Sequence, residues 1–148
     1  DLKHNPYSRR IMTNLYNFAD LHEMALYPCA YSMTFNVTEN RLNAILNQRS
    51  QDTLVANSWN VVQYAILVHL FAQVSGLVAG ELVHVIADAH IYDRHIPLVE
   101  ELIARPQYPA PKLTINPEIK NFYDFRVEDI IVSDYQAGSQ LKGIPVAV

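Results

Sequence analysis

Hydrophobic and polar residues alternate through the segment that runs from Ala30 to Asn47. Before a break in the pattern, one parity carries Tyr31, Met33, Phe35 and Val37; after it, the alternation resumes with Leu42, Ala44 and Leu46. The residues at the break, Thr38 to Arg41, are typical of a turn. Because side chains of a strand point alternately to its two faces, this pattern predicts a β-hairpin.

A second pattern, with helical spacing, follows between Asn57 and Gly76. The first four residues, Asn57 to Asn60, offer helix-start side chains, and Gly76 is a good C-terminal stop. Apolar or small residues recur between them at Val61, Tyr64, Ala65, Val68, Phe71, Ala72 and Ser75. The helix is apolar on nearly every side, so we expect it to be central and buried.

The second half of the chain predicts shorter elements. Glu81 to Ala87 is strand-like, and Ile96 to Ala104 is a short amphipathic helix opened by Pro97. Two further strands are expected over Lys112 to Ile115 and Phe122 to Val132. Together the elements predict an α+β fold, with a mixed or antiparallel sheet packed on a long central buried helix, as a single domain over residues 1–148.

Composition narrows the possible classes of function. The 148 residues are enough for one domain, half of them are hydrophobic, and the formal charge of −4 argues against binding DNA by bulk charge. The longest apolar stretch, Ala65 to Val74, is too short for a bilayer span. The chain starts at Asp1 in polar turn-like sequence without Met, so we expect a fragment or a processed chain.

Cys29 is the single cysteine of the chain, and an internal disulfide is therefore excluded. That fits a reducing compartment, and we expect a cytoplasmic protein. The predicted hairpin places Cys29 at the entry of its first strand and Arg49 at the exit of its second, so the two can meet. A guanidinium beside a thiol favours the reactive thiolate. Cys29 is then either a buried small apolar residue or a nucleophile.

Three other groups of polar residues leave two interpretations open. Arg9 and Arg10 suit either a solvated surface or anion recognition. Asn60 suits either a helix cap or an amide that reads a ligand. The segment Asp88 to His95 holds two histidines five residues apart, a spacing that does not match a zinc site, and we expect no metal there.

An ordered set of motifs resembles the C-terminal, nucleotide-binding part of the thymidylate synthase family. The resemblance covers nearly all 148 residues, and the ordered set is far more specific than any one motif. Its motifs are Ser8-Arg9-Arg10, Leu26-Tyr27-Pro28-Cys29, Gln48-Arg49-Ser50-Gln51-Asp52, Trp59-Asn60-Val61-Val62-Gln63-Tyr64, Asp88-Ala89-His90-Ile91-Tyr92 and the terminal Pro145-Val146-Ala147-Val148.

The resemblance implies a reaction in which methylenetetrahydrofolate supplies a one-carbon group that converts dUMP into dTMP. Cys29, Arg49 and Asn60 would be the catalytic residues, with Cys29 adding to C6 of uracil. Since C5 of uracil is a poor nucleophile, thiolate addition at C6 makes C5 enolate-like and divides one hard step into easier ones.

The resemblance also implies how the dUMP phosphate would be bound. Arg49 and Ser50 would contact the phosphate. Arg9 and Arg10 match arginines that reach across a dimer interface into the partner's phosphate site. We therefore expect a homodimer with shared sites, in which the sheets pack back to back.

Base, sugar and folate contacts follow from the same resemblance. Asn60 would read the uracil edge, with Gln48 supporting the pyrimidine pocket, and His90 and Tyr92 would hold the deoxyribose 3′-hydroxyl. Asp52 would lie at the pyrimidine pocket and contact the folate pterin. The terminal residues Ala147 and Val148 would close over the bound folate.

The sequence departs from the family pattern at two positions, and family members are also longer. Ala30 stands where many members have histidine after the cysteine, and Val148 replaces a common isoleucine. The family's N-terminal region supplies a catalytic glutamate that no residue here matches, so we expect this chain alone to be inactive. The alternatives are a dCMP or CMP hydroxymethylase of the same fold, against which Asn60 argues, and a non-catalytic dUMP-binding or dimerisation module.

Overall fold

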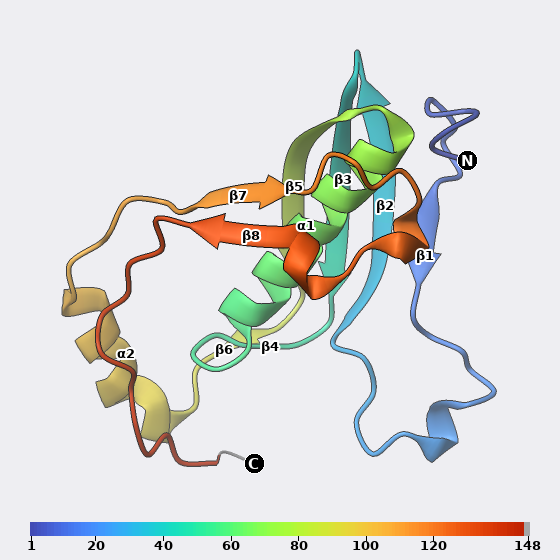
Figure 1. The fold of residues 1–148 in the computed structure, drawn as a ribbon. Coiled ribbons are helices and arrows are strands. Elements are labelled where there is room, and N and C mark those ends of the chain that lie inside the picture. The colour runs from blue at the N-terminus through green and yellow to red at the C-terminus, as the bar shows by residue number, and fades with distance from the viewer. Residues whose placement is uncertain (147–148) are drawn as a thin grey trace. The chain divides into compact units, whose positions relative to one another are not determined.

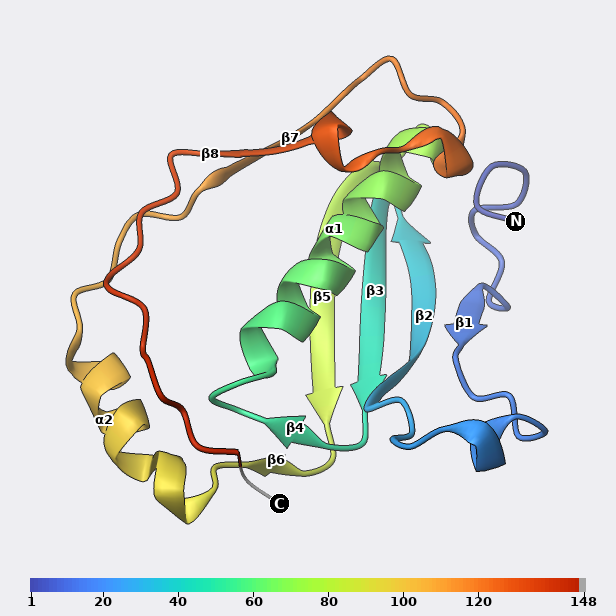
Figure 2. The ribbon, with the colours of Figure 1, turned by 60° about the horizontal axis from the view of Figure 1, so that its bottom comes forward.

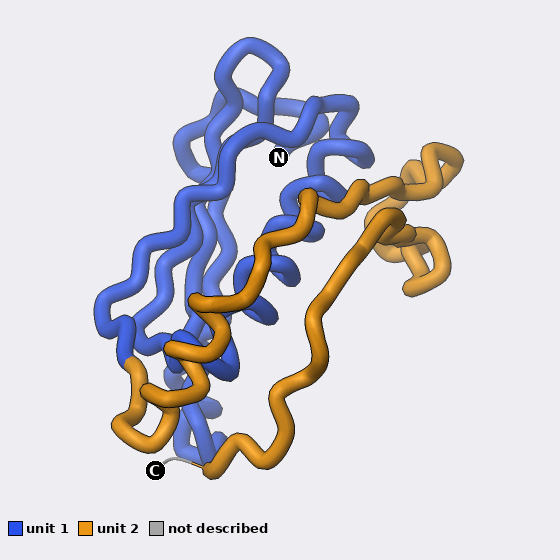
Figure 3. Tube along the Cα trace, turned by 90° about the vertical axis from the view of Figure 1, so that its left-hand side faces the viewer, with its two compact units in different colours: residues 1–90 blue, residues 91–148 orange. Residues whose placement is uncertain are grey.

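The computed structural model describes residues 1–146, and the chain forms two compact units, residues 1–90 and residues 91–148 (Figure 3). The expectation of one domain over the whole chain stays a prediction. No helix among the described residues is long and apolar enough to cross a membrane.

The first unit is built on a four-stranded mixed sheet in the order β1-β2-β3-β5 (Figure 1). The strands are β1 (Met12–Asn14), β2 (Ala30–Thr38), β3 (Arg41–Gln48) and β5 (Val78–Ile86). β1, β2 and β3 are antiparallel neighbours, whereas β3 and β5 run parallel. The hairpin predicted from the alternation is confirmed, with Glu39 at its tip in a left-handed conformation (φ 58°).

The helix α1 (Asn57–Ser75) lies along β3 and β5 on one face of this sheet (Figure 2). Its buried side chains meet the alternate strand residues that point to the same face, and Phe35 stacks edge-on against Phe71 at 5.5 Å. The chain leaves the helix at Gly76 in a left-handed conformation (φ 71°), as the sequence predicts. The core residues are Ile11, Ala30, Met33, Phe35, Leu42, Ala44, Leu46, Tyr64, Val68 and Ala72.

The expectation that α1 is buried on nearly every side is wrong. Trp59 is 78% exposed and Val62 is 55% exposed. A helix packed against one sheet buries only the stripe that faces the sheet, and the rest of its apolar surface remains open. The interpretation of Asn60 as the helix cap is also wrong, because the capping position is Ala56 and no side chain caps the helix.

Two short strands form a separate two-stranded sheet where β3 and β5 end. β4 (Gln51–Asp52) pairs in parallel with β6 (Ala89–His90). Backbone bonds from Gln51 N to Asp88 O at 2.8 Å and from Thr53 N to His90 O at 3.0 Å hold the pair. The segments after the two parallel strands are thereby brought together at one edge, beside the start of α1. The same unit contains a 3-10 turn, η1 (Leu21–Glu23).

The second unit contains α2 and a separate two-stranded sheet. Helix α2 (Ile96–Ala104) follows the turn η2 (Asp93–His95), and β7 (Lys112–Ile115) pairs antiparallel with β8 (Ile130–Ser133). The predictions of α2 and β7 are confirmed.

The predicted strand over Phe122 to Val132 is wrong in its first eight residues. That segment forms two 3-10 turns, η3 (Phe122–Asp124) and η4 (Val127–Asp129). The Asn121 side chain accepts a bond from Tyr123 N, and the Asp129 carboxylate accepts from Asn116 Nδ2 at 2.8 Å and Arg126 N at 2.9 Å. Such local side-chain bonds compete with a strand ladder. These bonds lower the pKa of Asp129, with the Asn116 amide contributing most.

Candidate active site

Cys29 and Arg49 lie opposite each other at the open end of the hairpin. The Arg49 amide donates to the Cys29 carbonyl at 2.9 Å. The pairing depends on a β-bulge: Ala30 pairs with Gln48 but Ser32 pairs with Asn47, so Tyr31 is one extra residue on β2. If Tyr31 were instead paired and the Ser32–Asn47 register continued without a bulge, Cys29 would lie opposite Ser50. The predicted meeting of the two residues is confirmed, although the sequence pattern did not reveal the bulge.

The guanidinium of Arg49 holds the loop that precedes β2. It donates to Tyr27 O at 2.7 Å and to Pro28 O at 3.2 Å, and its Nη2 lies 3.8 Å from the Cys29 sulfur. The thiol is half-buried. The sulfur is therefore partly open to a ligand and has a fixed positive charge beside it.

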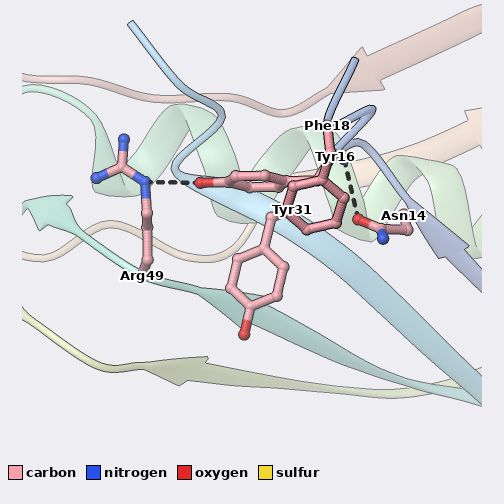
Figure 4. Close-up of a pocket in the computed structure, with 5 residues that line it drawn as sticks. All are labelled: Asn14, Tyr16, Phe18, Tyr31 and Arg49. Atoms are coloured by element: carbon pink, nitrogen blue, oxygen red, sulfur yellow. Dashed lines mark hydrogen bonds between the residues drawn. The ribbon is translucent and has the colours of Figure 1, made fainter. Parts of the chain in front are cut away.

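A pocket of about 370 Å³ opens beside this arginine (Figure 4). The aromatic rings of Tyr16, Phe18 and Tyr31 form most of its wall. Tyr16 packs edge-on against Tyr31 at 5.8 Å. Arg49 donates its Nε–H to the Tyr16 hydroxyl at 3.1 Å, and Asn14 accepts from the Tyr16 amide at 2.9 Å. Sequence reasoning missed Tyr16 and Phe18, since nothing in the pattern of the segment before Cys29 indicates that it folds back to Arg49.

Asn60 belongs to a network of amide side chains that spans three elements. Its Nδ2 donates to Gln51 Oε1 of β4 at 3.3 Å, and Gln51 is in turn hydrogen-bonded by Gln48 of β3. Gln48 Oε1 lies 2.9 Å from Nε2 of His84 on β5. Sequence reasoning named Gln48 and Asn60 for the site but not Gln51 or His84.

The other expected site residues of the first unit lie in different environments. Ser50 follows Arg49 directly and is half-buried, as is Asp52, whose Oδ1 accepts from Leu54 N at 3.1 Å and Val55 N at 3.2 Å. His90 Nδ1 lies 3.6 Å from Asp88 Oδ2. Arg9 and Arg10 are exposed just before β1.

The second unit holds Tyr92 and the chain end. Tyr92 packs edge-on against His95, which is 1% exposed, at 5.6 Å. His95 Nε2 lies 2.9 Å from Pro145 O, and Arg94 donates to Val146 O at 2.8 Å, so η2 holds the segment that leads to the terminus. Ala147 and Val148, expected over the folate, lie outside the described residues.

Titration and metal binding add two observations. Partial burial of His84 lowers its pKa, because desolvation disfavours the charged ring. Within residues 1–146, no three histidine, cysteine, aspartate or glutamate side chains gather in a way that could hold a metal ion.

Known proteins resemble this chain along almost its whole length. The sequence model of the family Thymidylate synthase matches residues 1–148. A thymidylate synthase from Bacillus licheniformis is 48% identical over 140 residues, and one from Clostridium beijerinckii is 46% identical over 143; each alignment covers 95% of this chain. The chain spans about half the length of these curated relatives, 50% and 54% respectively.

A solved structure agrees with the sequence comparison. Thermostable thymidylate synthase A from Bacillus subtilis superposes with a TM-score of 0.92 at 41% identity, over 97% of this chain and 52% of that one. This likeness defines the class, an α+β protein with the thymidylate synthase fold. The chain belongs to the thymidylate synthase family.

Proposed function

We propose that the protein to which this chain belongs is a thymidylate synthase, which methylates dUMP to dTMP with 5,10-methylenetetrahydrofolate as co-substrate. The observation that carries the proposal is the 3.8 Å contact between Arg49 Nη2 and the half-buried sulfur of Cys29, in a chain of this family. Family membership supplies the reaction, and the contact supplies a nucleophile with a cation beside it.

Cys29 is the proposed nucleophile. Its sulfur adds to C6 of the uracil ring, and the electron pair moves toward C5 and O4, so that C5 becomes able to attack the one-carbon unit. Arg49 supports this step in two ways. Its positive charge lies 3.8 Å from the attacking sulfur, and its bonds to Tyr27 O and Pro28 O hold the loop that carries the sulfur.

Arg49 and Ser50 are the proposed phosphate ligands in this chain. Arginine presents a planar set of donors that suits phosphate oxygens, and Ser50 lies next to it at the start of the β4 segment. Arg9 and Arg10 are exposed and therefore available to a phosphate in a second copy of the protein.

Asn60 is the proposed reader of the base. An amide both donates and accepts, and uracil presents a carbonyl oxygen and an N–H side by side. Gln48 supports this pocket from the end of β3, and His90 and Tyr92 are proposed for the 3′-hydroxyl. Asp52 is proposed at the pyrimidine pocket and toward the pterin, with Ala147 and Val148 covering the folate.

We also propose a homodimer in which the free face of the four-stranded sheet is covered by a second copy. The face opposite α1 exposes Ile45 of β3 together with Val83 and Val85 of β5. Adjacent exposed apolar side chains on a sheet mark a surface that a partner can cover. We expect the protein to be cytoplasmic, as the single thiol of this chain suggests, and this chain to need the rest of the protein for turnover.

Calorimetric titration of the full-length protein with dUMP, and separately with dCMP, tests the proposal. We expect dUMP to bind more tightly than dCMP. Absence of dUMP binding would contradict the proposed function, and equal binding of the two nucleotides would contradict the role of Asn60. Tighter binding of dCMP would instead favour a cytosine nucleotide hydroxymethylase.

A further inference from the structure

A chain of buried amides connects β5 to the proposed base reader, Asn60. Gln48 is 2% exposed and Gln51 is 1% exposed. Buried amides without partners are costly, and both of these are hydrogen-bonded to neighbours. No step of the proposed reaction uses Gln51 or His84, so their arrangement needs another explanation.

Backbone carbonyls fix which way each glutamine points. Gln48 Nε2 donates to Ser50 O at 2.8 Å, and an amide oxygen at that position would face a second acceptor. Gln51 Nε2 donates in the same way to Asp52 O at 3.3 Å. Because a carbonyl oxygen only accepts, neither glutamine can turn its amide over without placing oxygen against oxygen.

The fixed glutamines then determine the hydrogen on His84. Gln48 presents Oε1 to His84 Nε2 at 2.9 Å, so this ring nitrogen is the one that carries a hydrogen. Burial lowers the pKa of His84 and favours the neutral ring that donates only at Nε2. His84 therefore secures Gln48 from the side opposite Ser50.

The same logic extends to Asn60. Gln51 presents Oε1, and Asn60 donates to it from Nδ2 at 3.3 Å. If the Asn60 amide turned over, its oxygen would face the buried Gln51 oxygen, and two acceptors would meet without a hydrogen between them. The NH2 end of Asn60 is therefore held toward β4.

The orientation of this one amide distinguishes uracil from cytosine. Uracil offers an acceptor at O4 and a donor at N3, whereas cytosine offers a donor at N4 and an acceptor at N3. One orientation of an asparagine amide matches uracil, and the amide turned over matches cytosine. We propose that Gln51, anchored through Gln48 and His84, is a positioning residue that keeps Asn60 in the uracil-reading orientation. This inference rests on the proposed function.

Substitution of Gln51 in the full-length protein tests the inference by calorimetric titration with dUMP and dCMP. Gln51→Met removes the acceptor at nearly constant volume, and Gln51→Asn keeps an amide that is one methylene too short to reach Asn60. We expect each variant to lower the ratio of dUMP to dCMP affinity about tenfold, chiefly by improving dCMP binding. A merely structural role would weaken both nucleotides and leave their ratio unchanged.

Three variants complete the design. Gln51→Glu keeps an oxygen toward Asn60 and, protonated in this buried position, can donate to Asp52 O, so we expect the wild-type ratio. Gln63→Met, at an exposed position of α1, is the matched control and should also keep it. Asn60→Asp alters the reader itself and shows that the assay detects a changed ratio.

The outcomes separate the inference from the proposed function. Failure of the wild-type protein to bind dUMP would overturn the proposed function and this inference with it. A wild-type preference for dUMP that persists unchanged in either folded variant, Gln51→Met or Gln51→Asn, would overturn the inference alone. Circular dichroism identifies a variant that has not folded, and the other variant then decides.

Discussion

Arg49 and Tyr16 are joined by a hydrogen bond of 3.1 Å from the guanidinium Nε to the phenolic oxygen, across 33 positions of sequence. The same hydroxyl donates to Pro28 O at 3.3 Å. One phenolic group therefore links the cation to the backbone immediately before Cys29, and so fixes the cation relative to the thiol.

Replacing Tyr16 with phenylalanine removes this link and keeps the ring that packs against Tyr27 and Tyr31. We expect the rate constant for alkylation of Cys29 by iodoacetamide at neutral pH to fall about fivefold, since one hydrogen bond is worth about 1 kcal/mol. Tyr7→Phe is a matched control, because its hydroxyl bonds Glu39 O at the far end of the hairpin. A folded Tyr16→Phe protein that reacts at the wild-type rate would show that the hydroxyl does not position Arg49.

Cys29→Ala should abolish the covalent complex that 5-fluoro-dUMP forms with a thymidylate synthase in the presence of methylenetetrahydrofolate. The complex needs a sulfur to add at C6, and alanine offers none. Because the Cys29 side chain is half-buried, we expect the variant to fold nearly as well as the wild type. Mass spectrometry of the denatured full-length protein measures the adduct, and an adduct that persists would exclude Cys29 as the nucleophile.

Acid should destabilise the protein partly through His84. Its pKa is lowered in the folded state by burial, so as pH falls below about 6.5 the unfolded chain binds the proton first and folding is disfavoured. In His84→Gln, which keeps an N–H donor for Gln48, the free energy of unfolding should fall less between pH 7.5 and pH 5, two pH values chosen for urea titrations. The exposed His69→Gln provides the comparison, and equal slopes in all three proteins would contradict the assignment.

Gly80 marks a place where two strands approach too closely for a side chain. A Cβ at this position would clash with Asn43 Oδ1 and lie 2.9 Å from Leu42 O, where the pairing of β3 with β5 shifts. Gly80→Ala should lower the free energy of unfolding by about 1–3 kcal/mol, because the strands must separate. Urea denaturation measures this change, with Ala79→Gly as the reverse substitution at the neighbouring position. Equal stability of Gly80→Ala and the wild type would show that the strands can separate there at no cost in free energy.

Local periodicity predicted the elements that form the frame of the site. The alternation around Met33 and Phe35 predicted the hairpin, and the helical spacing that ends at Gly76 predicted α1. The prediction of a strand beginning at Phe122 was wrong because Asn121 and Asp129 form local side-chain hydrogen bonds, which the hydrophobic pattern does not reveal.

The contacts around the site were less predictable, since they join elements distant in sequence. His84 looks like an ordinary strand residue, and it approaches Gln48 only because β3 and β5 pair in parallel. Gln51 follows Gln48 by three residues, and its bond from Asn60 forms because α1 begins beside β4. Tyr16 lies in an irregular segment whose return to Arg49 has no periodic signal. The resemblance to a family named Cys29, Arg49 and Asn60, but it does not specify the neighbours that orient them.

The register of β2 against β3 limits how the length of the Ala30–Gln48 segment can change during evolution. Inserting a residue in either strand, or deleting one other than Tyr31, would slide the thiol past the arginine by a full position while leaving the other hydrophobic side chains chemically intact, whereas deleting Tyr31 itself would keep Cys29 opposite Arg49. Substitutions within the hairpin should therefore be tolerated far more often than insertions or deletions. The register of the two strands thus sets the distance between the Cys29 sulfur and the Arg49 guanidinium.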